Sequence, residues 1–120
     1  MRLEIAWWDL DGSPQTVDSL RAHLREGVAD DWAAVPGLRA KFWVADRDGN
    51  RWGAVMVWED DRPADSPLPP NRAAELIGRP VGHRMRFDVE AVAEGVHDLP
   101  VLHGLGAAFA PAPHPGPFRA

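Results

Sequence analysis

Residues 36–58 read PGLRAKFWVADRDGNRWGAVMVW, and this stretch decides the fold. It contains two runs rich in β-branched and aromatic residues, separated by the turn sequence Asp46-Arg-Asp-Gly-Asn50. Because an Asp-Gly pair between two such runs is typical of a tight turn, the stretch predicts a β-hairpin. We expect one apolar set of its first strand to face the helices: Leu38, Ala40, Phe42 and Val44.

A strand and a helix are predicted before the hairpin. Residues 2–8 alternate between two faces with the period of two that a strand requires. Ser13-Pro14 suits an N-cap and a first helical position. A helix is then predicted to about Trp32, ending before Pro36, because apolar residues recur at helical spacing: Val17, Leu20, Leu24 and Val28.

A loop, a second helix and a fourth strand are predicted after the hairpin. Residues 60–70 contain four prolines, which exclude a regular helix there. Residues 72–77 form about two helical turns, capped by Asn71 and stopped by Gly78. Residues 83–90 alternate as a strand. The order βαββαβ predicts an α+β, ferredoxin-like fold with an antiparallel four-stranded sheet, whose helix-free face must be polar, ligand-filled or covered by a second subunit.

The composition is that of one globular domain with an extension. A chain of 120 residues, 45% of them apolar and 26% charged, is large enough to bury a single core. We assign residues 1–93 to the ferredoxin-like domain and residues 94–120 to a proline-rich C-terminal extension. Its apolar part, including Leu99, Leu102 and Leu105, is expected to pack on the domain or on the partner subunit. Residues 110–117 resemble a polyproline-type arm.

Charge, cysteine content and missing motifs exclude several classes of function. A net charge of -5 provides no basic footprint, so neither nucleic acid nor a membrane is expected as a partner. No cysteine is present for a disulfide, a thiolate nucleophile or zinc. We expect no cofactor, because phosphate-loop and dinucleotide motifs are absent, and no metal, because the histidines lack ligand spacing. With no signal peptide or bilayer-spanning run predicted, a cytoplasmic protein is expected.

The chain resembles a known family in several spaced features. They are the order βαββαβ, the join Pro36-Gly37-Leu38, the strand Lys41-Phe42-Trp43 and the sequence Gly53-Ala-Val-Met-Val-Trp-Glu59. Over about residues 2–92 these features resemble the YdhR-type monooxygenases of the dimeric α/β-barrel superfamily, which also includes the antibiotic-biosynthesis monooxygenases. The resemblance implies a homodimer in which two sheets face each other as a barrel.

The same resemblance implies a function. It is binding of a hydrophobic, aromatic or polyketide-like small molecule and its oxidation by dioxygen without metal or flavin. Haem chemistry is not expected, because haem-degrading relatives use an Asn on the first strand and none precedes Asn50 here. The alternatives are a non-catalytic small-molecule-binding or assembly protein, or a cyclase, isomerase or lyase of the same fold.

Aromatic and charged residues on one strand parity form the candidate ligand site. Trp8 and Trp43 share that parity with three charged residues, and on the resemblance this is the barrel-facing side: Glu4, Arg39 and Lys41. Rings beside cations would bind a planar anionic ligand. The alternative is that both tryptophans only fill the dimer interface.

Three cations and one histidine are candidates for chemistry. Lys41, Arg84 and Arg86 would stabilise an enolate or phenolate of the substrate, or would pair with carboxylates such as Glu4 on adjacent strands. His83, where the fourth strand begins, is a general base or a solvated residue. We therefore expect Lys41, His83 and Arg86 to be catalytic and the others to bind substrate: Glu4, Trp8, Arg39, Trp43 and Arg84.

Overall fold

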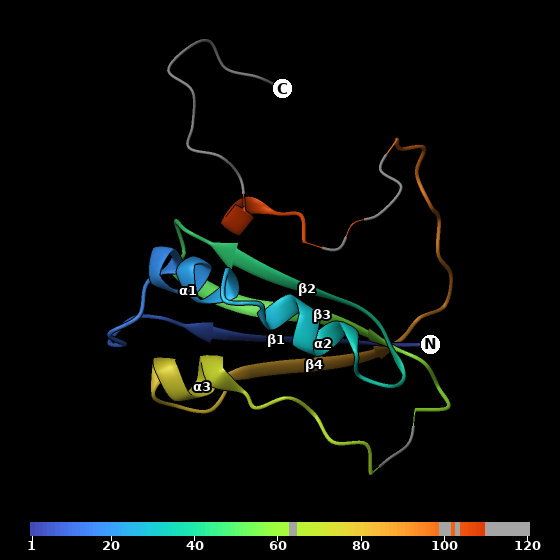
Figure 1. Ribbon diagram of the computed structural model, residues 1–120, viewed down its shortest axis with the longest axis horizontal. Helices are drawn as coiled ribbons and strands as arrows, with labels where there is room; N and C mark the ends of the chain where they lie inside the picture. Colours follow the sequence, from blue (N-terminus) through green and yellow to red (C-terminus); the bar gives the residue numbers. More distant parts are fainter. Residues whose placement is uncertain (63–64, 99–101, 103, 110–120) are drawn as a thin grey trace.

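A computed structural model of the chain describes residues 1–62, 65–98, 102 and 104–109 (Figure 1). The elements in these residues are, in chain order, β1 (Arg2–Asp9), α1 (Val17–Leu24), α2 (Val28–Ala33), β2 (Leu38–Asp46), β3 (Arg51–Trp58), α3 (Arg72–Ile77), β4 (His83–Asp88) and the 3-10 helix η1 (Ala107–Phe109). The sheet has the order β2-β3-β1-β4, and all neighbouring strands are antiparallel. This α+β arrangement is compatible with the predicted ferredoxin-like fold.

The predicted hairpin is present as β2 and β3. In its turn, the Gly49 N–H donates to Asp46 Oδ1 at 3.1 Å, and Asn50 takes a left-handed φ of 53°. β2 has one irregularity in its pairing with β3, a register shift between Leu38 and Ala40. Such a bulge changes which residues of a strand share a face, so strict alternation along β2 fails at this point.

The single helix predicted after the first strand is divided into α1 and α2. α1 ends at Leu24 with Arg25 as its C-cap, and Gly27, with a left-handed φ of 92°, is the N-cap of α2. The helix begins later than Ser13-Pro14, because Thr16 and Ser19 form a reciprocal capping box. That box satisfies two N–H groups at once, and the prediction of a start at Ser13-Pro14 is therefore wrong.

The helices cover one face of the sheet, which we call the helix side. Trp8 of β1 is 6% exposed and packs in the main core cluster with Leu20 of α1 and Ile77 of α3. A second cluster joins Met56 of β3 to Trp32 of α2. In Figure 1, α1 and α2 run across the same side of the sheet. The residues that alternate with Trp8 along β1 therefore point away from the helices.

The opposite face, which we call the open face, is also apolar. The strand register places one apolar row across all four strands: Phe42, Val55, Ile5 and Met85. Phe42 and Met85 are 47% and 46% exposed. The prediction that the apolar set of β2 faces the helices is wrong for Ala40, Phe42 and Val44, whereas Leu38 packs in the cluster of Trp32. The bulge explains this split.

The second half of the domain follows the prediction closely. At the start of α3, the Asn71 side chain accepts from the Ala74 N–H, and Gly78 ends the helix in the left-handed conformation. Between β3 and α3 the described residues form neither helix nor strand. No helix in the described part of the chain is long and apolar enough to cross a membrane.

The C-terminal extension returns to α1. Its 3-10 helix η1 contacts α1. The Arg25 Nε atom donates to the carbonyl oxygen of Ala108 at 2.6 Å, and Ala108 joins the main core cluster. Leu102 and Leu105 remain 54% and 56% exposed. Leu99 and the predicted arm at 110–117 lie outside the described residues.

Candidate functional site

A cavity of about 610 Å³ lies between the helices and the sheet, and we call it the helix-side cavity. Residues from β1, β2, β3, α2 and the loop before α3 line it. Its wall contains five of the six tryptophans of the chain: Trp8, Trp32, Trp43, Trp52 and Trp58. The volume falls within the range of about 300–1,000 Å³ that is usual for small-molecule sites.

The single lysine of the chain lies at this cavity. Lys41 stands opposite Met56 in the β2–β3 pairing, and its Nζ atom is 3.2 Å from the centroid of the Trp32 ring and 5.0 Å from that of Trp43. Burial lowers the pKa of Lys41 to about 7, while the charge of Glu4 acts in the opposite direction. A large fraction of the amine is therefore neutral near pH 7.

Glu4, in the wall of the cavity, pairs with two arginines of β4, of which Arg86 does not line the cavity. Its Oε2 atom lies 3.0 Å from Arg84 Nη1 and 2.8 Å from Arg86 Nε, and the Glu4 side chain is 14% exposed. Glu4 and Arg84 line the cavity. Of the two roles considered for the arginines, pairing with Glu4 is present for both.

The strand faces correct the predicted location of the ligand site. Trp8, Trp43, Glu4 and Lys41 were expected on the helix-free side, but all four line the helix-side cavity. The strand alternation identifies correctly that these residues share a face. The face is the opposite one, because the stripe of α1 packs on Trp8 and the side chain of Lys41 lies under α2.

Arg39 and His83 do not line the helix-side cavity. Arg39 pairs with Glu59 through Nη1 at 2.9 Å. His83 lies in register with Trp7 on the open face, and the two rings stack with centroids 4.7 Å apart. The structure therefore separates His83 from Lys41 by the thickness of the sheet.

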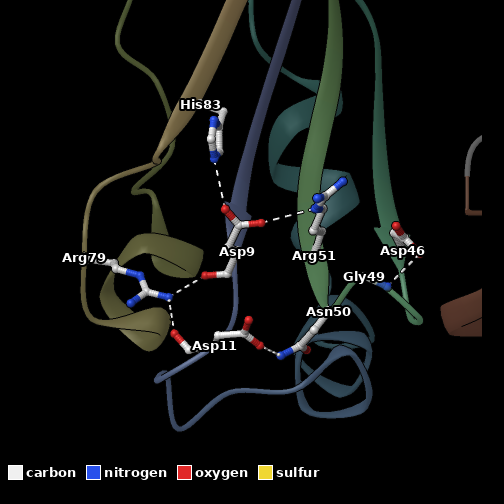
Figure 2. Close-up of polar contacts among 8 residues, drawn as sticks. All are labelled: Asp9, Asp11, Asp46, Gly49, Asn50, Arg51, Arg79 and His83. Carbon is white, nitrogen blue, oxygen red and sulfur yellow. Dashed lines mark hydrogen bonds and ion pairs between the residues drawn. The ribbon is translucent and has the colours of Figure 1, made fainter.

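A polar cluster surrounds His83 at one end of the open face (Figure 2). His83 Nε2 lies 3.0 Å from Asp9 Oδ2, and Arg51 Nε lies 3.2 Å from Asp9 Oδ1. The hydrogen bond with His83, and to a smaller extent Arg51, lowers the pKa of Asp9 below its ordinary value. Because the Asp9 carboxylate holds one imidazole nitrogen of His83, the other ring nitrogen points away from Asp9. A histidine that acts as a general base beside an orienting carboxylate has the same arrangement.

The loops beside this cluster are tied together by further hydrogen bonds. Figure 2 shows Arg79 Nη2 donating to the carbonyl oxygens of Asp9 and Asp11. Asn50 Nδ2 donates to Asp11 Oδ1 at 2.8 Å. The end of β1, the hairpin turn and the segment after α3 are thus joined around Asp9.

A second hollow of about 610 Å³ lies at the outer edge of β2. It is bordered by Phe42 and by the C-terminal residues around η1, such as Leu105 and Phe109. Trp32, Lys41 and Trp43 line both this hollow and the helix-side cavity. Lys41 therefore borders both the second hollow and the helix-side cavity.

Sequence reasoning missed several residues of these sites. Trp32, Trp52 and Trp58 were not assigned to the ligand site, although Trp52 and Trp58 alternate with Met56 on one face of β3. Asp9 was not assigned to any site, yet it is the last residue of β1 and lies on the same face of the strand as Trp7. The sequence signal that could have placed Asp9 on this face is its alternation with Trp7 along the strand.

Two further observations bear on identity. In the described part of the chain, no group of three or more His, Asp or Glu residues is placed to hold a metal ion. Comparisons with protein-family models and with curated proteins give no match.

Proposed function

We propose that the protein binds a planar, hydrophobic and aromatic small molecule in the helix-side cavity. The observation that carries this proposal is the concentration of tryptophans in the wall of a cavity of about 610 Å³. Tryptophan rings offer large flat apolar surfaces, which stack with planar ligands. Lys41 and Arg84 at the same wall favour a ligand that carries an anionic or phenolic group.

A fluorescence titration tests this function. 2-Naphthoate is the probe, with 2-naphthol and cyclohexanecarboxylate as matched compounds that lack the carboxylate and the aromatic plane, respectively. We expect saturable quenching of tryptophan emission in the order naphthoate, naphthol, cyclohexanecarboxylate. Equal binding of the aromatic and the saturated acid would contradict stacking, and absence of saturable binding by all three would contradict the proposed site.

Oxidation of the bound molecule is the second candidate function. We propose it as a reaction with dioxygen that requires neither metal nor flavin, in keeping with the family resemblance. An activated methylene of the substrate would become a carbonyl, with one oxygen atom retained and the other released as water, so the substrate supplies all four electrons. Lys41 and Arg84 favour this chemistry, since cations at the cavity would stabilise the enolate or phenolate that reacts with oxygen.

Oxygen uptake distinguishes the enzyme from a binding protein. Polyphenols and polyketide-like quinols are the substrates to screen in an oxygen electrode. If the Lys41 amine stabilises charge that develops only during the reaction, Lys41→Met should lower turnover more than affinity. A protein that binds these compounds without oxygen uptake is a non-catalytic binding protein or a cyclase, isomerase or lyase, and product analysis separates those alternatives.

We also propose that a second copy of the chain covers the open face. Phe42, Val44, Met85 and Phe87 are each more than 40% exposed there, and a sheet face of this kind is rarely left in contact with water. At the end of this face, Asp9 pairs with His83 and Arg51 of its own subunit. The charges there are thus balanced within one subunit, which leaves the apolar rows for a two-fold contact.

A further inference from the structure

Lys41 is unusual because its amine is half-buried among aromatic rings without a carboxylate partner. The Nζ atom lies over the face of Trp32 at 3.2 Å. Glu4, whose charge acts on Lys41, directs its carboxylate to Arg84 and Arg86. Lys41 takes part in no ion pair in the described part of the chain. The cost of removing the ammonium group from water is therefore only partly offset.

The charged groups around Lys41 do not restore its ordinary basicity. The titratable and charged groups that line the same cavity are, by element, Glu4 of β1, His23 of α1, Glu26 in the turn after α1, Asp31 of α2, Arg72 of α3 and Arg84 of β4. Only Glu4 opposes the effect of burial on the pKa of Lys41, which lies at about 7. At pH 7 a large fraction of the amines is then neutral, against about one in 3,000 for an ordinary lysine.

We propose that Lys41 captures an aldehyde or ketone group of the bound ligand as a Schiff base. This inference rests on the proposed function for the position of the ligand, and it names the substrate class as carbonyl compounds with a planar aromatic body. A neutral lysine amine in an apolar pocket is the form that attacks carbonyl carbon. The tryptophan walls would hold the flat part of the ligand while its carbonyl carbon meets the Nζ atom from the cavity.

The reaction balances without any other reagent. The Nζ lone pair forms a bond to the carbonyl carbon, and the carbonyl oxygen takes a proton to give a carbinolamine. The nitrogen then loses its remaining transferable proton, the hydroxyl group leaves, and a carbon–nitrogen double bond and one water molecule result. No atom is oxidised or reduced overall, and hydrolysis reverses the sequence. When the imine is protonated, the Trp32 face stabilises the resulting cation.

The chain makes this proposal easy to test, because it holds a single lysine. The competing amine is that of Met1, whose nitrogen is 2.7 Å from Asp60 Oδ2. The whole protein is incubated with 2-naphthaldehyde, reduced with sodium borohydride and analysed by intact mass and peptide mapping. Acetaldehyde serves as the small carbonyl control, and Lys41→Arg serves as the variant that keeps charge and stem length.

We expect one naphthylmethyl group on Lys41, with the rate of trapping rising through an inflection near pH 7. At pH 7 the rate should exceed that of the same protein unfolded in urea by at least tenfold, because unfolding returns the amine to water. Lys41→Arg should lose this adduct and retain any labelling of Met1. Acetaldehyde should label Lys41 much more slowly than the naphthaldehyde does.

Two results would overturn the proposal. One is labelling at Met1 alone in the native protein, and the other is a trapping rate at Lys41 that unfolding does not lower. Because both are read in the wild-type chain, they hold even if Lys41→Arg fails to fold. Saturable naphthoate binding without trapping would reject the Schiff base and leave the proposed function intact. Trapping at Lys41 without naphthoate binding would support the Schiff base and reject the proposed function.

Discussion

The imidazole of His83 lies 3.0 Å from the carboxylate of Asp9 through Nε2, and its ring stacks on Trp7 with an angle of 11° between the planes. His83 and Asp9 are 74 positions apart in the chain. They meet because β1 pairs with β4, and because Asp9, Trp7 and His83 all project from the open face. This contact therefore lies on the side of the sheet opposite to Lys41.

The Asp9 contact predicts a component of acid stability. The pKa of Asp9 is lowered in the folded protein, first by the hydrogen bond with His83. A lowered folded pKa contributes stability above the unfolded value of about 3.9, and this contribution is lost as the pH falls through the folded value. Asp9→Asn should therefore flatten the loss of stability between about pH 5 and pH 2, measured by urea unfolding at each pH. An equal slope for the wild type and for Asp9→Asn would contradict the prediction.

A variant of His83 tests whether the open face takes part in ligand binding or turnover. His83→Ala should leave naphthoate affinity unchanged, because His83 does not line the helix-side cavity. If turnover is found, an unchanged pH–rate profile would remove His83 from the mechanism. Loss of the acidic limb of the profile, where the rate falls as the base is protonated, would restore His83 as the general base and would require substrate on the open face.

The tryptophans of the two faces form a matched pair for ligand binding. Trp43→Ala should weaken naphthoate binding by about 1–3 kcal/mol, or about 5- to 140-fold in Kd, because a stacking surface is lost. Trp7→Ala removes the same type of side chain from the open face and should leave Kd within twofold. Thermal unfolding of both variants checks that Trp43→Ala remains folded at the assay temperature. Equal losses of affinity would show that the ligand does not occupy the helix-side cavity.

Assembly through the open face predicts a dimer that one charge disrupts. Phe87 is 47% exposed, so Phe87→Glu removes little packing within the subunit but places a charge in the proposed contact. Multi-angle light scattering at micromolar concentration should give a dimer for the wild type and a monomer for this variant. Arg72→Glu, an exposed substitution on α3, is the control and should remain dimeric. A monomeric wild type at that concentration would contradict the proposal.

Removal of the C-terminal extension should lower stability. Truncation after Gly95 eliminates the bond from Arg25 to the Ala108 carbonyl and the buried Ala108 methyl group. A charged hydrogen bond and one buried methyl group together contribute about 2–3 kcal/mol. The midpoint of thermal unfolding should fall by roughly 8–20 °C. Ala108→Asp in the full-length chain should reproduce most of this change, and an unaltered midpoint in both would mean that η1 contributes nothing.

The sequence by itself determined the local elements. The Asp48-Gly49 turn between two β-rich runs gave the hairpin, and Asn71 with Gly78 bounded α3, since these signals act within a few residues. The alternation of β1 also identified the set to which Trp8 and Glu4 belong. Two local features of the predicted helical stretch were not predicted from the sequence. They are the Thr16 capping box and the left-handed Gly27.

Only the tertiary structure decided which face of the sheet the helices cover. Both faces carry large apolar side chains, and period-two alternation is identical for either choice. The decision depends on how the stripe of α1 fits against Trp8, and on the bulge after Leu38 that turns Lys41 under α2. The partners of Lys41 and Asp9 could likewise not be predicted from nearby residues. Helix packing brings Trp32 to Lys41, and strand pairing brings His83 to Asp9.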